Sequence, residues 1–172
     1  MSPGLARALL LVRGLVPAAA TLAAVILAAL PWGVPFLAPV TPFFALIAVY
    51  YWSVHRPELL PAPAVFGLGL LQDFLTGSPP GLVALLLLLV HALGASQRRT
   101  LLGQSFAVEW TGFLLVALGT ALAAWLLACV YHAALLEPGP FGAQALLTVA
   151  LYPVGTWALA RAARLARPVG AT

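Results

Sequence analysis

Uninterrupted apolar blocks, separated by short polar breaks, run through most of this chain of 172 residues. The longest begins after Arg13 and carries no formal charge for 42 residues, up to Arg56. One membrane-spanning helix needs about 20 apolar residues, so this block is long enough for two. Its middle contains the sequence PWGVP at residues 31–35, whose two prolines remove backbone donors and interrupt a helix. The pattern therefore predicts two spans joined by a turn.

The same alternation of apolar blocks and breaks predicts four further spans. Polar or proline-rich breaks lie at residues 55–58, 76–80, 98–99 and 137–140. The predicted spans cover residues of about 15–30, 41–54, 59–75, 81–96, 110–134 and 141–160. Residues 1–172 are therefore predicted to form a single all-α domain, a polytopic integral membrane protein with six transmembrane helices and no separate soluble domain.

The arginines predict the orientation of these helices, because positively charged short loops are retained in the cytoplasm. With six spans, every arginine falls on one side of the membrane: Arg7, Arg13, Arg56, Arg98, Arg99, Arg161, Arg164 and Arg167. Both termini are then expected in the cytoplasm, and an odd number of spans would break this parity. Aromatic residues are expected at the inner boundary (Tyr50, Tyr51, Trp52, Trp110) and at the outer boundary (Trp32, Phe36, Tyr131, Phe141).

A secretory signal peptide is the rival interpretation of the first predicted helix. A signal peptide has an apolar region of only about 7 to 15 residues, and the run after Arg13 is longer. Removal of this helix would also leave an odd number of spans, so the arginines would no longer all fall on one side of the membrane. We therefore expect the first helix to be a span.

Composition excludes the common soluble classes. Hydrophobic residues make up 63% of the chain and charged residues 7%, against roughly 25% charged residues in a soluble domain. The net charge of +4 does not indicate nucleic-acid binding, because arginines scattered between apolar blocks form no phosphate-binding face. The single cysteine, Cys129, excludes an internal disulfide and a cysteine-based metal site. The sequence has no phosphate-binding glycine loop, no paired intramembrane carboxylates and no nucleophile with a base, so neither an enzyme nor a cofactor is expected.

Asp73 carries the main candidate chemistry, because a carboxylate inside a membrane helix is costly unless something compensates it. It lies near the outer end of the third predicted span, where the helix dipole also disfavours a negative charge. Ser78 followed by Pro79 is typical of a helix start, so free backbone N–H groups of the fourth span are expected to face the carboxylate. Asp73 would then act as a latch that closes a helical hairpin. The other interpretation, in which Asp73 binds a ligand, an ion or a partner at the outer face, stays open.

Glycines around Asp73 indicate close packing and a tight turn. Gly69 precedes Asp73 by four residues and shares its helix face, where the missing side chain lets another helix approach. Gly77 and Gly81 continue the four-residue spacing, but the prolines between them favour a loop. In that loop Gly77 is expected to have a positive φ.

Other residues within the spans predict contacts between helices. Pro153 removes the hydrogen bond to the carbonyl group of Val149, which predicts a kink in the sixth span. Neither His91 nor His132 has another metal ligand at helical spacing, so no metal site is expected and both are expected to form interhelical hydrogen bonds.

The fifth span carries one acid and one small-residue face. Glu109 is expected to pair with Arg98 or Arg99 at the inner end of the span. Gly119 and Ala123 suit a helix contact, either within the chain or with another protein. These residues are expected to form contacts and to take no part in a reaction.

The residues around Asp73 resemble the central signature of the bacterial rod shape-determining MreD family. The resemblance rests on Tyr51-Trp52 at the end of the second span, Arg56-Pro57 after it, and GLLQDFLTGSPPG at residues 69–81. It covers residues 42–81 well and residues 147–165 loosely, the latter through Tyr152-Pro153 and the basic tail. The family pattern of glycine, aspartate, Gly-Ser and glycine falls here on Gly69, Asp73, Gly77, Ser78 and Gly81. Pro80 departs from that pattern.

The resemblance implies a non-enzymatic inner-membrane subunit of the cell-wall elongation (Rod) complex, which helps maintain rod cell shape. It implies MreC as the direct partner, and MreB and the elongation glycosyltransferase and transpeptidase of peptidoglycan synthesis as indirect partners. Membrane lipid is also expected to contact the chain, whereas nucleic acid is not. The outer ends of the third and fourth spans, around Asp73 and Gly77, are expected to determine the shape of the protein or to dock MreC.

The alternative function is the substrate-binding membrane subunit of an energy-coupling-factor vitamin transporter. That function requires a polar, aromatic-lined outer pocket for the vitamin. The short outer loops offer few hydrogen-bond donors, so the sequence favours the cell-wall subunit.

Overall fold

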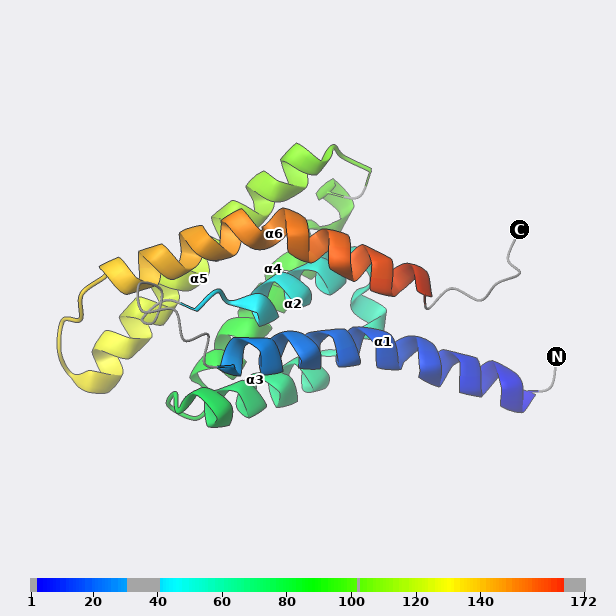
Figure 1. Cartoon of the computed structure of the whole chain (residues 1–172), viewed down its shortest axis with the longest axis horizontal. Coiled ribbons are helices and arrows are strands. Elements are labelled where there is room, and N and C mark those ends of the chain that lie inside the picture. Colours follow the sequence, from blue (N-terminus) through cyan, green and yellow to red (C-terminus); the bar gives the residue numbers. More distant parts are fainter. Residues whose placement is uncertain (1–2, 31–40, 102, 166–172) are drawn as a thin grey trace.

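The computed structural model describes residues 3–30, 41–101 and 103–165, with side-chain surroundings for residues 15–30, 41–100 and 103–164. Every regular element in this part of the chain is helical (Figure 1). The elements are α1 (Pro3–Ala29), α2 (Phe44–His55), the 3-10 turn η1 (Pro57–Leu59), α3 (Ala62–Thr76), α4 (Leu82–Leu101), α5 (Phe106–His132) and α6 (Gly139–Leu165). The predicted all-α class with six helices is confirmed for the described residues.

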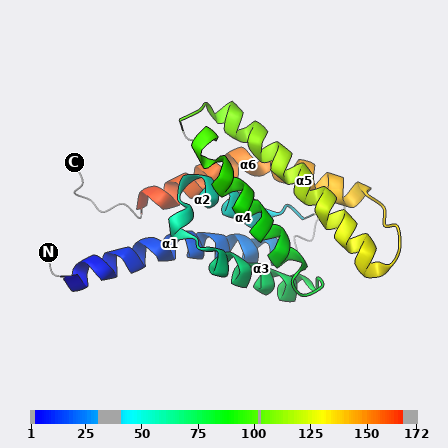
Figure 2. The ribbon, with the colours of Figure 1, turned by 180° about the vertical axis from the view of Figure 1, so that it is seen from behind.

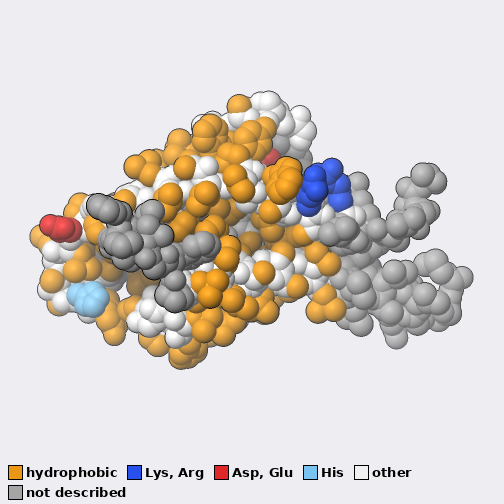
Figure 3. Space-filling view, viewed as in Figure 1, with side chains coloured by type: hydrophobic (Ala, Val, Ile, Leu, Met, Phe, Trp, Pro, Cys, Tyr) orange, Lys and Arg blue, Asp and Glu red, His pale blue; other side chains and the backbone are white. Residues whose placement is uncertain are grey.

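Successive connections lie alternately at two ends of the molecule (Figures 1 and 2). The arginine end holds the start of α1, the turn η1, the connection from α4 to α5 and the end of α6; its described basic residues are Arg56, Arg98, Arg99, Arg161 and Arg164. The hairpin end holds the end of α1, the turn from α3 to α4 and the connection from α5 to α6. Figure 3 shows basic side chains near the end of α6 and hydrophobic side chains over the middle of the molecule. The charges are thus separated from the apolar middle.

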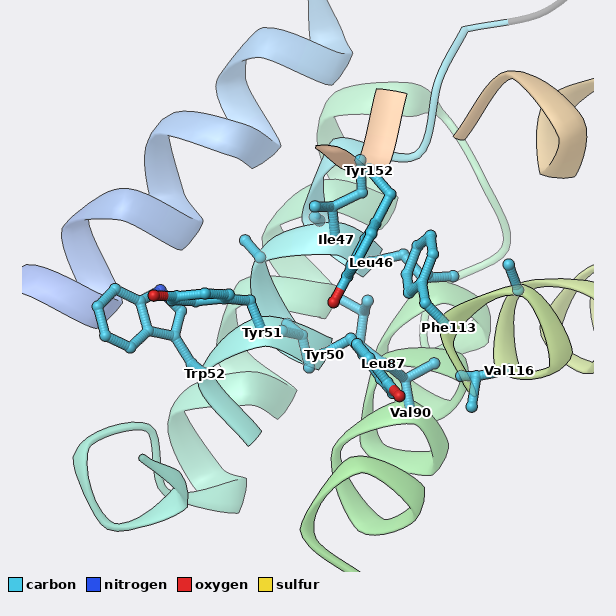
Figure 4. Close-up of a cluster of buried hydrophobic side chains, with 14 of the residues drawn as sticks. Leu46, Ile47, Tyr50, Tyr51, Trp52, Leu87, Val90, Phe113, Val116 and Tyr152 are labelled. Atoms are coloured by element: carbon cyan, nitrogen blue, oxygen red, sulfur yellow. The ribbon is translucent and has the colours of Figure 1, made fainter. Parts of the chain in front are cut away.

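Helix α2 forms the centre of the molecule. Its residues from Ala45 to Val54 are all buried, and it packs against α1, α4 and α6. The rings of Tyr50, Phe113 and Tyr152 meet beside it (Figure 4), with centroids 5.2 Å apart for the first pair and 4.0 Å apart for Phe113 and Tyr152. Aromatic residues from α2, α5 and α6 therefore share one core.

The helices differ in whether they are long enough to cross a membrane. Among the described residues α4, α5 and α6 are long and apolar enough by length and composition, whereas α2, α3 and the segment Leu15–Ala29 of α1 are apolar but shorter. The 12 residues of α2 measure about 18 Å, less than the ~30 Å of a hydrocarbon core. Because other helices enclose α2, a bilayer around the molecule would meet little of it, and its length would not need to match that thickness. Six crossings stay a prediction.

Several helices begin at residues that differ from the predicted spans; among them, α2 begins at Phe44 instead of about residue 41 and α5 at Phe106 instead of about residue 110. α1 begins at Pro3 instead of about residue 15, because proline suits the first position of a helix and residues 5–13 contain neither proline nor glycine. α3 begins at Ala62 instead of about residue 59, because Pro61 lacks a backbone donor and disfavours helical geometry at the residue before it. Residues 57–59 form the turn η1 instead.

Two other helices continue beyond their predicted ends. α4 extends past Arg98 and Arg99 to Leu101, and α6 extends to Leu165. Basic residues stabilise the negative end of a helix dipole, so arginines suit the last turn and do not end the helix. The predicted turn at residues 31–35, with Trp32, and the nearby Phe36 lie outside the described residues.

The predicted aromatic belt at the inner boundary is wrong for α2. Tyr50, Tyr51 and Trp52 are 0%, 7% and 2% exposed, because α2 is the central helix and its aromatic side chains fill the core. Trp110 of α5 and Tyr131 near the opposite end of that helix are exposed. For these two residues an interfacial position stays a prediction.

Candidate functional site

Asp73 lies in the last turn of α3 and is fully buried. The backbone N–H groups of Gly81 and Ala84 donate to its Oδ2 atom over 2.8 and 3.4 Å. The N–H group of Val83 donates to Oδ1 over 2.9 Å. These donors belong to the start of α4, where N–H groups lack helical partners and the helix dipole is positive. The first turn of α4 therefore compensates the carboxylate of α3, which is the geometry of a latch.

Ser78 does not cap α4, contrary to the prediction. Its hydroxyl group instead lies 3.0 Å from Oγ1 of Thr76. The helix begins only at Leu82, and the first carbonyl group that accepts a helical bond in it is that of Gly81. The capping group is the side chain of Asp73, which comes from the preceding helix and lies outside the range of a local capping rule.

The turn between the two helices depends on glycine at both ends. Gly77 ends α3 with φ 68° and ψ 21°, and Gly81 precedes α4 with φ 95°. The N–H groups of Gly77 and Ser78 donate to the backbone carbonyl group of Asp73. A residue with a Cβ atom is disfavoured in this left-handed region. The predicted positive φ at Gly77 is confirmed.

Close packing of α3 on α4 occurs at Gly69. A Cβ atom added there would overlap the Cα atom of Ala84 and lie 3.0 Å from its Cβ atom. Gly67, two residues earlier, would meet no atom within 4 Å. The predicted close approach at Gly69 is confirmed, and Ala84 takes part both in this contact and in the bond to Asp73.

A second polar cluster lies at the arginine end, around Glu109 of α5. The hydroxyl group of Tyr152 donates to Oε1 of Glu109 over 2.6 Å, and Nε2 of His55 lies 3.9 Å from Oε2. The predicted pairing of Glu109 with Arg98 or Arg99 is wrong. Arg98 instead lies 3.4 Å from Glu58 on η1. Sequence reasoning missed this cluster because its members are far apart along the chain.

Pro153 lies within α6 and leaves the carbonyl group of Val149 without its helical donor. The indole Nε1 of Trp110 donates to this carbonyl oxygen over 3.1 Å. The missing bond is thus replaced by a contact from α5. The predicted kink stays a prediction.

Tyr51 and Trp52 do not join the Asp73 hairpin. They lie in the second half of α2, toward the arginine end, where Tyr51 stacks on His55 at 4.3 Å between ring centroids. Trp52 meets Tyr51 edge-on at 5.3 Å. The residues that resemble the family signature are therefore in two places, with the glycines, Asp73 and Ser78 at the hairpin end.

The predicted interhelical contacts are found for one of the two histidines. Nδ1 of His91 lies 2.7 Å from the hydroxyl oxygen of Ser53, which joins α4 to α2. His132 is exposed, and among the described residues it has only a ring contact with Tyr131, so no interhelical hydrogen bond of His132 is found in this part of the chain. A Cβ atom at Gly119 would meet no atom within 4 Å, so this residue makes no close helix contact within the described chain.

The arrangement is suited to holding helices together. The carboxylate of Asp73 is occupied by backbone donors, and the described residues contain no group of three histidine, cysteine or acidic side chains that could hold a metal ion. No curated protein and no solved structure matches the chain. The family model described as rod shape-determining protein MreD matches residues 10–153, which is most of the chain and includes the whole Asp73 hairpin. With its apolar helices, the chain therefore belongs to the MreD family of membrane proteins that take part in determining rod shape.

Proposed function

We propose that this chain is a non-enzymatic subunit of the cell-wall elongation complex in the bacterial inner membrane. Its direct partner is MreC, and MreB and the elongation glycosyltransferase and transpeptidase act with it indirectly. The family match over residues 10–153 carries the proposal. The hairpin adds support, because its buried carboxylate is bound by backbone amides and is not presented to a substrate. The vitamin-transporter alternative gains no support from this match.

Within this proposal the chain crosses the membrane six times, with both termini in the cytoplasm. Support comes from the alternation of connections between two ends and from the arginines that gather at one of them (Figure 1). Single cysteines at Gln104 and Ala134, both exposed, in a Cys129→Ser background, test this topology. We expect an impermeant thiol reagent to label intact spheroplasts at position 134 only. Labelling at position 104 from outside would contradict the orientation.

The proposed surface for MreC is the exposed apolar side of α3. Its Phe74 is 72% exposed and Leu75 is 49% exposed, immediately after the buried Asp73. Because Asp73 is buried and accepts bonds from backbone groups of α4, we propose that it acts on the partner indirectly, by determining how α3 stands against α4. Both interpretations of Asp73 contribute to this proposal. As a latch, Asp73 orients α3, and the exposed apolar side of α3 binds MreC.

Leu75→Ala tests this surface, with Leu126→Ala on α5 as a matched control that is 50% exposed. We expect Leu75→Ala to reduce co-purification of MreC several-fold at unchanged membrane accumulation, and Leu126→Ala to leave it unchanged. Equal co-purification with both variants would contradict docking through α3.

In the native host, depletion of the protein is expected to turn rods into spheres. A vitamin requirement with normal cell shape would instead favour the transporter.

A further inference from the structure

One face of α6 carries a stripe of side chains that the described part of the chain leaves uncovered. Its residues are Ala150, Val154, Trp157, Arg161 and Arg164, and we call this face the α6 stripe. They follow one another at spacings of three and four, which places them on one side of a helix. Val154 is 62% exposed and Trp157 is 58% exposed, and the other three residues are exposed as well. The stripe is apolar along α6 and becomes basic toward the arginine end.

Trp157 and Arg161 form one unit at the point where the stripe changes character. The Cζ atom of Arg161 lies 4.6 Å from the ring centroid of Trp157. A guanidinium group over an indole ring is held there by a cation–π contact. Figure 3 shows basic side chains directly beside hydrophobic ones at this end of α6. A cationic group and an apolar surface thus meet within one turn of the helix.

The two arginines of the stripe are available for an anion. Among the described residues neither forms an ion pair with an acid, and Arg164 only donates from Nε to the carbonyl group of Ala160 over 3.4 Å. A guanidinium group has five N–H donors, so most of these donors stay unused. The four acids of the chain lie elsewhere: Glu58 beside Arg98, Asp73 at the start of α4, Glu109 beside Tyr152, and Glu137 before the opposite end of α6.

The length of the stripe fits one leaflet of a bilayer. α6 is one of the helices that are long and apolar enough to cross a membrane. From Ala150 to Arg161 the stripe measures about 16 Å at about 1.5 Å per residue, and half of a hydrocarbon core is about 15 Å. With Arg161 at the level of the head groups, Trp157 lies at the boundary, where tryptophan is enriched. Charge and apolar surface are then spaced as they are in a phospholipid.

We propose that the α6 stripe binds one anionic phospholipid. The phosphate group accepts hydrogen bonds from Arg161 and Arg164, and an acyl chain packs on Trp157 and Val154. Arginine suits this role because its guanidinium group donates two parallel bonds to phosphate oxygens. A free phosphate ion or a nucleic acid would not use the apolar part of the stripe. From the proposed function this inference takes only that α6 crosses a membrane, so its failure would leave the role with MreC untouched.

The full chain in nanodiscs of phosphatidylglycerol and phosphatidylcholine with the same acyl chains provides the test. Native mass spectrometry measures how much of each lipid stays bound to the chain. We expect the wild type to retain phosphatidylglycerol in preference to phosphatidylcholine. Arg161→Gln is expected to reduce this preference about fivefold, as for one arginine at an anionic membrane surface. Absence of a preference in the wild type overturns the proposal.

Arg98→Gln is the matched control. Arg98 is a partly exposed arginine of α4 at the same end of the molecule, where it lies 3.4 Å from Glu58. The substitution removes the same charge from the same end but leaves the α6 stripe intact. We expect it to change the preference by less than about twofold, because the remaining attraction is screened and general. Equal losses for Arg98→Gln and Arg161→Gln overturn the proposal, since the lipid would then respond to the basic end as a whole.

Brominated acyl chains locate the bound lipid, because bromine quenches indole fluorescence on contact. The contribution of Trp157 is the difference in fluorescence between the wild type and Trp157→Phe. We expect brominated phosphatidylglycerol to quench this contribution more strongly than brominated phosphatidylcholine at the same mole fraction. Equal quenching by the two lipids overturns the placement on α6.

A second copy of the chain is the other occupant that could cover this face. Native mass spectrometry would then give the mass of two chains without bound lipid, and Trp157→Leu would reduce it to the mass of one. That result overturns the proposal. All residues changed on the stripe are exposed, so we expect these variants to unfold at the same temperature as the wild type.

Discussion

The two ends of the molecule compensate an acidic side chain in different ways. At the hairpin end, Asp73 accepts three bonds from backbone N–H groups that follow it by 8 to 11 residues. At the arginine end, Glu109 meets the side chains of Tyr152 and His55, which belong to other helices and lie 43 and 54 positions away. The partners of Asp73 are backbone groups close to it along the chain, whereas the partners of Glu109 are side chains far from it along the chain.

This difference determines what each site tolerates. Any residue at the start of α4, except proline, supplies the N–H groups that Asp73 accepts, so the site depends on Asp73 and on the geometry of the turn. The site of Glu109 depends on the identity of each partner side chain. We therefore expect single changes at Asp73 to have larger effects than single changes around Glu109.

The largest effect is expected for Asp73→Ala, which leaves three N–H groups at the start of α4, two of them buried, without their acceptor. The expected loss of unfolding free energy is about 3 kcal/mol or more, since each unpaired buried group costs about 1–3 kcal/mol. The midpoint of thermal unfolding of the purified protein, determined by size-exclusion chromatography after heating, is expected to fall accordingly. Asp73→Asn keeps one acceptor oxygen and is expected to fall between Asp73→Ala and the wild type.

Glu58→Ala is the control for a lost acid. Glu58 is exposed and its contact with Arg98 is 3.4 Å long, so the expected change is about 0–1 kcal/mol. Equal stability of Glu58→Ala and Asp73→Ala would show that the latch does not hold the hairpin.

The next largest effect is expected for Gly69→Val, which forces α3 away from Ala84. Overpacking of this kind costs about 1–3 kcal/mol. Gly67→Val in the same helix is the matched control, because a side chain there meets no atom within 4 Å. Comparable midpoints of thermal unfolding for the two variants would contradict the close approach of α3 and α4.

A smaller effect is expected at the arginine end for Tyr152→Phe, which removes the hydroxyl donor to Glu109 but keeps the ring in the core. A lost bond to a charged group costs about 1.5–3 kcal/mol when buried, and the partial exposure of Glu109 places the expected value near or below the lower limit. Tyr131→Phe, at an exposed tyrosine, is the control and is expected to leave stability unchanged. A larger loss for Tyr152→Phe than for Asp73→Ala would reverse the ranking of the two ends.

The same contrast explains what the sequence could predict. The closed hairpin, the close approach at Gly69 and the positive φ at Gly77 follow from residues near one another along the chain, and the structure contains all three. Glu109 could not be assigned to Tyr152, because that pairing depends on how α5 packs against α6.

Helix boundaries and the position of α2 could also not be predicted from the sequence pattern. An apolar helix facing lipid and one enclosed by other helices have the same composition, so Tyr51 and Trp52 were predicted at a membrane boundary although they lie in the core. Ser78 matched a local capping rule, but the carboxylate of Asp73 provides a charged acceptor for the same helix. In both cases tertiary packing outweighed a local preference.

The last effect, comparable in size to that of Tyr152→Phe, is expected for Gly77→Ala, and its sign is the informative part. Gly77 has φ 68°, a region that costs an L-residue about 1–2 kcal/mol, so alanine is expected to destabilise the hairpin although a Cβ atom there meets no atom within 4 Å. Gly119→Ala makes the same change inside α5, also in open space, where alanine favours the helix by about 1 kcal/mol. Thermal unfolding of the two variants should therefore shift in opposite directions. A shift in the same direction would show that the backbone conformation of the turn does not control the stability of the hairpin end.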